Sequence, residues 1–81
     1  MRKALRKDIA LSDTGVVFNP ATGDSFSVNP VGLDILRLLS EGHDDDALRT
    51  SIMEVWEVDA TTFNKDYSDF LQLLNQHKLL Q

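Results

Sequence analysis

The sequence predicts an α+β fold, winged-helix-like in its order, in which a three-stranded antiparallel sheet comes first and three helices follow. Two observations support this prediction. Residues 5–28 alternate polar and apolar side chains in short runs separated by turn residues, which is the pattern of half-buried strands. From Pro30 onward the apolar residues recur at helical spacing, and helices are needed to cover the apolar face of so small a sheet.

The strands are expected at about residues 5–11, 16–19 and 24–28, with the turn sequences SDTG and PATG between them. Glycine and proline in such positions are typical of hairpin turns. Alternate residues of a strand share one face. We expect the core-facing side to carry Leu5, Lys7, Ile9 and Leu11 from the first strand, Val16 and Phe18 from the second, and Phe26 and Val28 from the third.

The helices are expected at about residues 30–40, 45–56 and 61–76. Asn29 is a suitable N-cap for the first helix, Pro30 suits its first turn, and Gly42 is a natural stop. Asp44 or Asp45 can cap the second helix. We expect the inward stripes to contain Leu48, Ile52, Val55 and Trp56 from the second helix and Phe63, Tyr67, Phe70, Leu71 and Leu74 from the third.

Length and composition predict one domain over residues 1–81, because a chain of this size supports a single modest core. The absence of cysteine excludes a disulfide framework and fits a cytoplasmic location. No apolar run approaches the roughly 20 residues of a membrane span, so no membrane contact is expected. Four of the eight basic residues precede Asp8, which leaves four basic against thirteen acidic residues. Such a surface repels phosphate backbones and favours a basic or neutral partner.

The sequence GHDDDA is the only cluster that resembles a metal site. Calcium would require further oxygen ligands where Leu48 and Arg49 stand, and helix capping accounts for the aspartates. The two histidines, His43 and His77, are far apart in the sequence, and no glycine-rich phosphate loop is present. We therefore expect no metal, no cofactor and no catalytic residue, so the protein is predicted not to be an enzyme.

The last two predicted helices have the form of a helix-turn-helix, which makes a winged-helix DNA-binding or regulatory protein the alternative. A recognition helix usually presents arginine, lysine, asparagine or glutamine to base edges. The third helix carries one cation, Lys65, beside Asp66 and Asp69. This acidic surface disfavours a nucleic-acid partner.

The third predicted strand, DSFSV, is an edge of the sheet. It has no internal lysine, proline or bulge, the devices that commonly protect edges. An unprotected edge can accept a peptide as an added strand. Leu73 lies off the central line of the third helix, beside Asp66 and Phe70, where it could contact a partner, although a partly exposed leucine is also ordinary.

The segments VVFNPATGDSFSVNPVGLDILRLLSEG and VWEVDATTFNKDYSDFLQLLNQHKLL resemble the PqqD-like family of small peptide chaperones, also called RiPP recognition elements. The resemblance covers about residues 16–80. Family members frequently have glycine in the closing turn, where this sequence has His77 and Lys78, so the end of the third helix is expected to differ. The motif residues are Asn29, Pro30 and Gly32 at the strand–helix junction, Gly42 after the first helix, Asp66, Phe70, Leu71 and Leu74 in the third helix, and Leu79 and Leu80 at the end.

The resemblance implies a non-catalytic adaptor that binds the leader of a ribosomally made precursor peptide and presents it to a modifying enzyme, such as a radical S-adenosylmethionine (SAM) enzyme. Pyrroloquinoline quinone synthesis is one pathway that it suggests. A monomer or weak dimer is expected. The family typically adds the leader to the third strand, beside the third helix. Carried onto this chain, the peptide-binding residues are Ser25, Phe26, Ser27 and Val28 on the strand and Phe63, Asp66, Tyr67, Phe70 and Leu73 on the helix.

Overall fold

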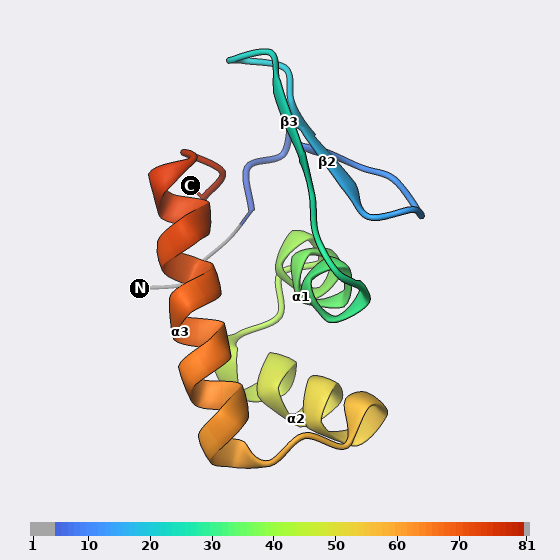
Figure 1. The fold of residues 1–81 in the computed structure, drawn as a ribbon, viewed down its shortest axis with the longest axis vertical. Coiled ribbons are helices and arrows are strands. Elements are labelled where there is room, and N and C mark those ends of the chain that lie inside the picture. The colour runs from blue at the N-terminus through green and yellow to red at the C-terminus, as the bar shows by residue number, and fades with distance from the viewer. Residues whose placement is uncertain (1–4, 81) are drawn as a thin grey trace.

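The computed structural model describes residues 5–80, so Arg2 and Lys3 of the basic start lie outside the described residues. The predicted α+β class and element order are confirmed. The sheet is antiparallel in the order β1-β2-β3, which makes β3 an edge strand. Figure 1 shows the β2–β3 hairpin at the top, α1 and α2 below it, and α3 along one side. The elements are β1 (Ala10–Leu11), β2 (Val16–Asn19), β3 (Asp24–Ser27), α1 (Pro30–Ser40), α2 (Asp45–Trp56) and α3 (Ala60–Gln76).

Local capping sets where α1 and α2 begin. The side-chain oxygen of Asn29 accepts a hydrogen bond from the Gly32 amide at 2.7 Å, and that of Asp44 accepts one from Ala47 at 2.8 Å. These oxygens satisfy backbone N–H groups that have no partner within the helix. Asn29 is therefore the N-cap of α1, as the sequence predicted, and of the two candidates for α2 it is Asp44 that caps the helix.

The end of α3 uses a residue other than glycine in a left-handed conformation. Lys78 has φ 59°, and the Leu79 amide donates to the Leu74 carbonyl at 3.0 Å. Gly42 closes α1 in the same way, with φ 86°. This closure turns the chain back toward the core. It buries Leu79 completely and leaves Leu80 half-buried.

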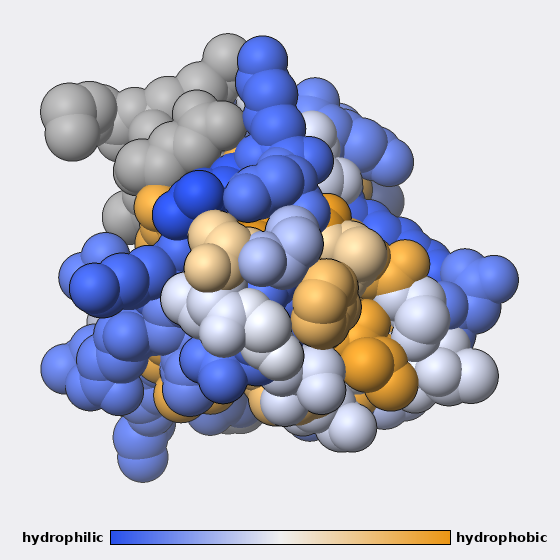
Figure 2. Space-filling model, turned by 90° about the horizontal axis from the view of Figure 1, so that it is seen from above, coloured by the Kyte–Doolittle hydropathy of each residue, from blue (hydrophilic) through white to orange (hydrophobic). Residues whose placement is uncertain are grey.

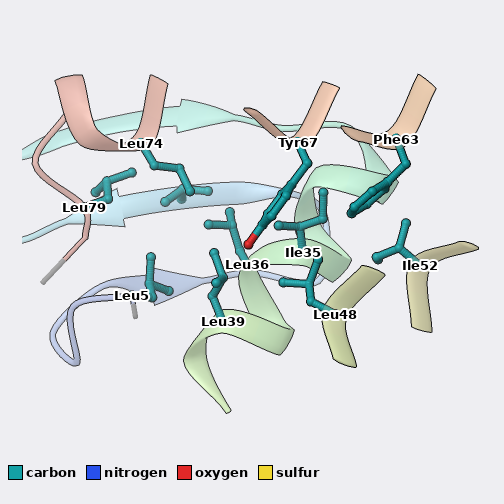
Figure 3. Packing of buried hydrophobic residues seen from close by; sticks show 11 residues of the cluster. Leu5, Ile35, Leu36, Leu39, Leu48, Ile52, Phe63, Tyr67, Leu74 and Leu79 are labelled. Atoms are coloured by element: carbon teal, nitrogen blue, oxygen red, sulfur yellow. The ribbon is translucent and has the colours of Figure 1, made fainter. Parts of the chain in front are cut away.

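One apolar core joins the sheet to all three helices. Figure 3 shows side chains from α1, α2 and α3 converging with Leu5 and Leu79. No helix within residues 5–80 is long and apolar enough to cross a membrane. The buried cluster contains Leu5, Val17, Ile35, Leu36, Leu39, Leu48, Ile52, Phe63, Tyr67, Leu74 and Leu79.

The face of β2 that packs on the core is opposite to the predicted one. Val17 and Asn19 are buried, whereas Val16 and Phe18 are 40% and 41% exposed. Val17 pairs across the sheet with Phe26, which packs against the core. Because only one side of a strand can face the helices, this pair turns Val16 and Phe18 outward. The buried Asn19 side chain accepts the amide N–H of a turn residue two positions later, at 3.0 Å.

The predicted first strand, residues 5–11, is mostly wrong. Only its last two residues, β1, join the sheet. Leu5 instead forms an isolated antiparallel bridge with Leu80, near the other end of the chain. A turn separates the two segments and leaves Lys7 exposed. The polar–apolar alternation was real, but the two ends of the segment pair with different parts of the molecule.

The predicted stripe of α2 was also wrong at one position. Leu48 and Ile52 are buried, but Val55 is 67% exposed. Trp56 is half-buried and donates its indole N–H to Asp34 of α1 at 2.9 Å. The Trp56–Asp34 hydrogen bond and the burial of Leu48 and Ile52 fix which side of α2 faces the core. Val55 therefore lies at the margin of the apolar stripe.

Tyr67 links α3 to the start of α2. Its hydroxyl donates to the Asp45 carboxylate at 2.8 Å, and its ring stacks on Phe63 with centroids 5.2 Å apart. Burial raises the pKa of Tyr67 well above its ordinary value, and the hydrogen bond and negative charge of Asp45 raise this pKa further. The folded state therefore strongly favours the protonated tyrosine.

We predict that Gly15→Ala destabilises the protein more than Gly23→Ala. Both glycines have positive φ, 91° and 79°, so alanine at either is strained. A Cβ on Gly15 would lie 2.6 Å from the carbonyl oxygen of Val28, whereas a Cβ on Gly23 would have no atom within 4 Å. Urea unfolding followed by Trp56 fluorescence should show an extra loss of at least about 1 kcal/mol for Gly15→Ala. Equal losses would contradict this account.

We also predict that Tyr67 makes the protein less stable at alkaline pH. The pKa of Tyr67 is raised by folding, so only the unfolded chain ionises as the pH rises past the ordinary value of 10.0. The free energy of unfolding should therefore fall above about pH 10. Tyr67→Phe should be less stable at neutral pH but should show a smaller alkaline loss. The tyrosinate absorbance of this single tyrosine gives a direct check. Parallel pH profiles for the two proteins would disprove the coupling.

Candidate functional site

The outer edge of β3 presents backbone groups to solvent. The Val28 amide donates to the Gly15 carbonyl of the neighbouring segment at 2.8 Å. In an antiparallel ladder, residues that bond to the partner strand alternate with residues whose backbone groups point away. Phe26 is two residues before Val28, so its backbone N–H and C=O groups also point toward β2. The N–H and C=O groups of Ser25 and Ser27 point toward the outer edge, where no described strand pairs with them.

One side of α3 faces this edge. Asp66, Phe70, Leu73 and His77 follow one another at spacings of four, three and four residues, so they lie on one face of the helix. The ring of His77 stacks on Phe26 of β3, with centroids 5.1 Å apart and an angle of 25° between the rings. This stacked pair joins the C-terminal end of α3 to the edge strand.

A hollow of about 400 Å³ lies between α1 and α3, just beyond Ser27, the last residue of β3. Gly32, in the first turn of α1, is closely approached by the strand–helix junction: a Cβ on this glycine would lie only 3.2 Å from Oδ1 of Asn29 and from Cβ of Val28. The ring of Phe70 would be in ordinary contact with it, at 3.5 Å. The lining is mostly apolar, with the carboxylate of Asp66 among it. It consists of Asn29, Val31, Gly32, Ile35, Val58, Asp66 and Phe70.

Figure 2 views the molecule from the hairpin end. Apolar residues gather from the middle of this face toward its lower right, and hydrophilic residues lie mainly to the left of them and above them. Phe26 and Val28 are half-buried and pack against the core, whereas Ser25 and Ser27 are exposed. The segment with the free edge thus also carries two partly exposed apolar side chains, Phe26 and Val28, and strand addition uses both main-chain pairing and side-chain contacts.

The structure places the predicted helix residues in two groups. Asp66 and Leu73 are exposed and Phe70 is half-buried, so these three side chains are available on the face toward β3. Phe63 and Tyr67 are buried, with 4% and 8% of their surface exposed, and they stack on each other inside the core. Those two rings therefore support the helix from beneath, and direct contact with a ligand stays a prediction for them.

Sequence reasoning did not include several residues of the site. Val31, Ile35 and Val58 line the hollow, and His77 stacks on Phe26 of β3. Val58 precedes α3, whereas Val31 and Ile35 belong to α1. These three side chains therefore meet only because the two helices pack together. Gly32 was the one available signal, because a glycine in the first turn of a helix indicates a close approach by another group.

A second hollow of about 260 Å³ lies between α1 and α2. Its cation, Arg37, already pairs with Asp13 at 2.8 Å and lies 3.9 Å from Asp34. None of its lining residues lies in or next to β3, whereas the hollow between α1 and α3 begins at Asn29, two residues after that strand. The hollow beside β3 is therefore the better candidate site.

The comparisons with known proteins agree with this geometry. The family model described as coenzyme PQQ synthesis protein D (PqqD) matches residues 14–80. The solved structure of TbiB1 in complex with the TbiA(beta) leader peptide is 30% identical, covering 96% of this chain and 94% of that chain with a TM-score of 0.84. Lasso peptide synthetase B1 complexed with the leader peptide shares the fold, with a TM-score of 0.81, 21% identity and coverage of 100% and 99%.

No curated protein matches the chain. The family match, however, begins in the turn before β2 and runs through the closing turn of α3, so it includes the edge strand, the strand–helix junction and the helix that faces them. Since this match spans far more than half of the sequence, the chain belongs to the PqqD family.

Proposed function

We propose that this protein is a peptide-binding adaptor, which holds the leader of a ribosomally made precursor peptide and presents it to a separate modifying enzyme. The observation behind this proposal is the free edge of β3, with Ser25 and Ser27 directed outward, beside the apolar hollow of α1 and α3. TbiB1 and lasso peptide synthetase B1, which share the fold, are both described in complex with leader peptides. Their ligands support a peptide as the partner of this chain.

The proposed roles follow from burial and hydrogen bonding. The backbone of Ser25 and Ser27 pairs with the leader, and Phe70 and Leu73 contact its side chains. Asp66 adds charge selectivity. Phe26 and Val28 pack against the core and hold the edge in place, and we propose the same supporting role for Phe63 and Tyr67.

We propose a non-catalytic role, in which the chemistry belongs to the partner enzyme, for example a radical SAM enzyme. The absence of cysteine fits action in a reducing cytoplasm. The comparisons give no support to the DNA-binding alternative. The face of α3 that carries Asp66 would also repel a phosphate backbone.

The direct test is capture of partners from the native lysate, with the full chain as bait, after nuclease treatment, with mass spectrometry as the readout. We expect a short precursor peptide to be recovered, with or without a modifying enzyme, and its binding to depend only weakly on salt. Recovery of DNA before nuclease treatment and of nothing afterwards would favour the regulator instead, because phosphate contacts weaken steeply with salt.

Ser27→Pro should weaken binding of the captured peptide about tenfold or more. Proline removes the outward N–H, which we expect to bond to the added strand, and it is tolerated on an edge where no ladder bond is lost. Ser27→Ala is the matched control, because it changes the same side chain but keeps the N–H; its affinity should stay near that of the wild type. Fluorescence anisotropy measures both. Unchanged binding by a folded Ser27→Pro protein would rule out strand addition at this edge.

A further inference from the structure

Asp66 is the one acidic group among the residues that line the hollow beside β3, which are otherwise neutral and mostly apolar. None of the basic residues in the described part of the chain forms an ion pair with it, whereas Asp13, Asp46 and Asp8 each pair with an arginine. Its carboxylate shares the hollow with Val58 and Phe70, whose side chains offer only apolar surface. The hollow therefore combines apolar contact with one negative charge that no described cation neutralises.

The hollow lies where an added strand would run beyond β3. The strand ends at Ser27, and the chain turns into α1 at Asn29, whose side chain bonds to the Gly32 amide. A peptide paired with the edge of β3 can continue in the same direction past this turn. Because alternate side chains of a strand face the same way, one of its residues would enter the hollow toward Asp66.

We propose that this hollow selects a lysine or arginine of the leader, which makes Asp66 a specificity-determining residue; this inference rests on the proposed function above. The aliphatic stem of the side chain lies on Val58 and Phe70, and its cationic end meets the carboxylate of Asp66. The aromatic ring of Phe70 adds an attraction for the cation. A purely apolar side chain would instead take the carboxylate partly out of water with no partner, which is unfavourable.

The test uses a phage-displayed library of random peptides, selected on the full-length wild-type protein. We expect the selected peptides to carry lysine or arginine at one recurring position within an apolar context. Selection on Asp66→Asn should lose this preference. Asp69→Asn is the matched control: it removes a neighbouring carboxylate of α3 that does not line the hollow, and the preference should remain.

Exchanging the two charges tests whether Asp66 and the recurring cation of the peptide contact each other directly. Replacing the recurring cation of a selected peptide by glutamate should weaken its binding to the wild type about five- to tenfold. This is the effect expected when a partly exposed ion pair is lost. The same glutamate peptide should bind Asp66→Lys at least as well as the wild type binds the original peptide. Circular dichroism of each variant checks that the fold is retained.

The outcomes separate this inference from the proposed function. The role of Asp66 would be overturned if the selected peptides had no recurring cation, or if the preference for a cation survived Asp66→Asn. Strand addition would still be supported in that case if the selected peptides lost their binding to Ser27→Pro. If the wild type selects no peptides, the proposed function and the cation site both fail. If Ser27→Pro binds the selected peptides equally well, strand addition at β3 fails, and with it the placement of the cation by a strand that continues past β3.

Discussion

The strand–helix junction at Asn29 is the constraint on which the rest of the site depends. The side-chain oxygen of Asn29 accepts the Gly32 amide at 2.7 Å, and its carbonyl accepts the Leu33 amide at 2.9 Å. Pro30 has no N–H to donate and suits the first helical turn. The strand must therefore stop and α1 must begin at once. This places a glycine of the first helical turn directly beside the end of the edge strand, where Phe70 of α3 can lie against it.

The position of α3 is fixed by contacts in its middle and at its C-terminal end. Tyr67 bonds to Asp45 at the start of α2, and the closing turn buries Leu79 in the core. His77 then stacks on Phe26 of β3. With α3 held in this way, the distance between the helix and the edge strand is set before any ligand arrives. Such preorganisation lowers the cost of binding, because less of the protein must become ordered when the partner binds.

An open strand edge is usually a liability, since it can pair with the edge of another molecule. Here β3 is only four residues long and its outward side chains are serines. Exposed Val16 and Phe18 lie on the adjacent strand, on the same outer face. A short edge limits uncontrolled pairing, while the acidic character of the chain adds repulsion between copies. The fold therefore keeps the edge of β3 open at a modest risk of self-association.

The sequence by itself determined the order of the elements, the bounds of the helices to within one residue and the location of the free edge, because caps such as Asn29 and the spacing of apolar residues are local properties. The tertiary structure alone decided which face of β2 turns inward, so that Val17 is buried. It also paired Leu5 with the end of the chain and brought Val58 and Phe70 to α1 to form the hollow. Periodicity shows which residues share a face, but not which partner that face will meet. That choice depends on how segments distant in the sequence fill one core, and a local pattern does not contain this information.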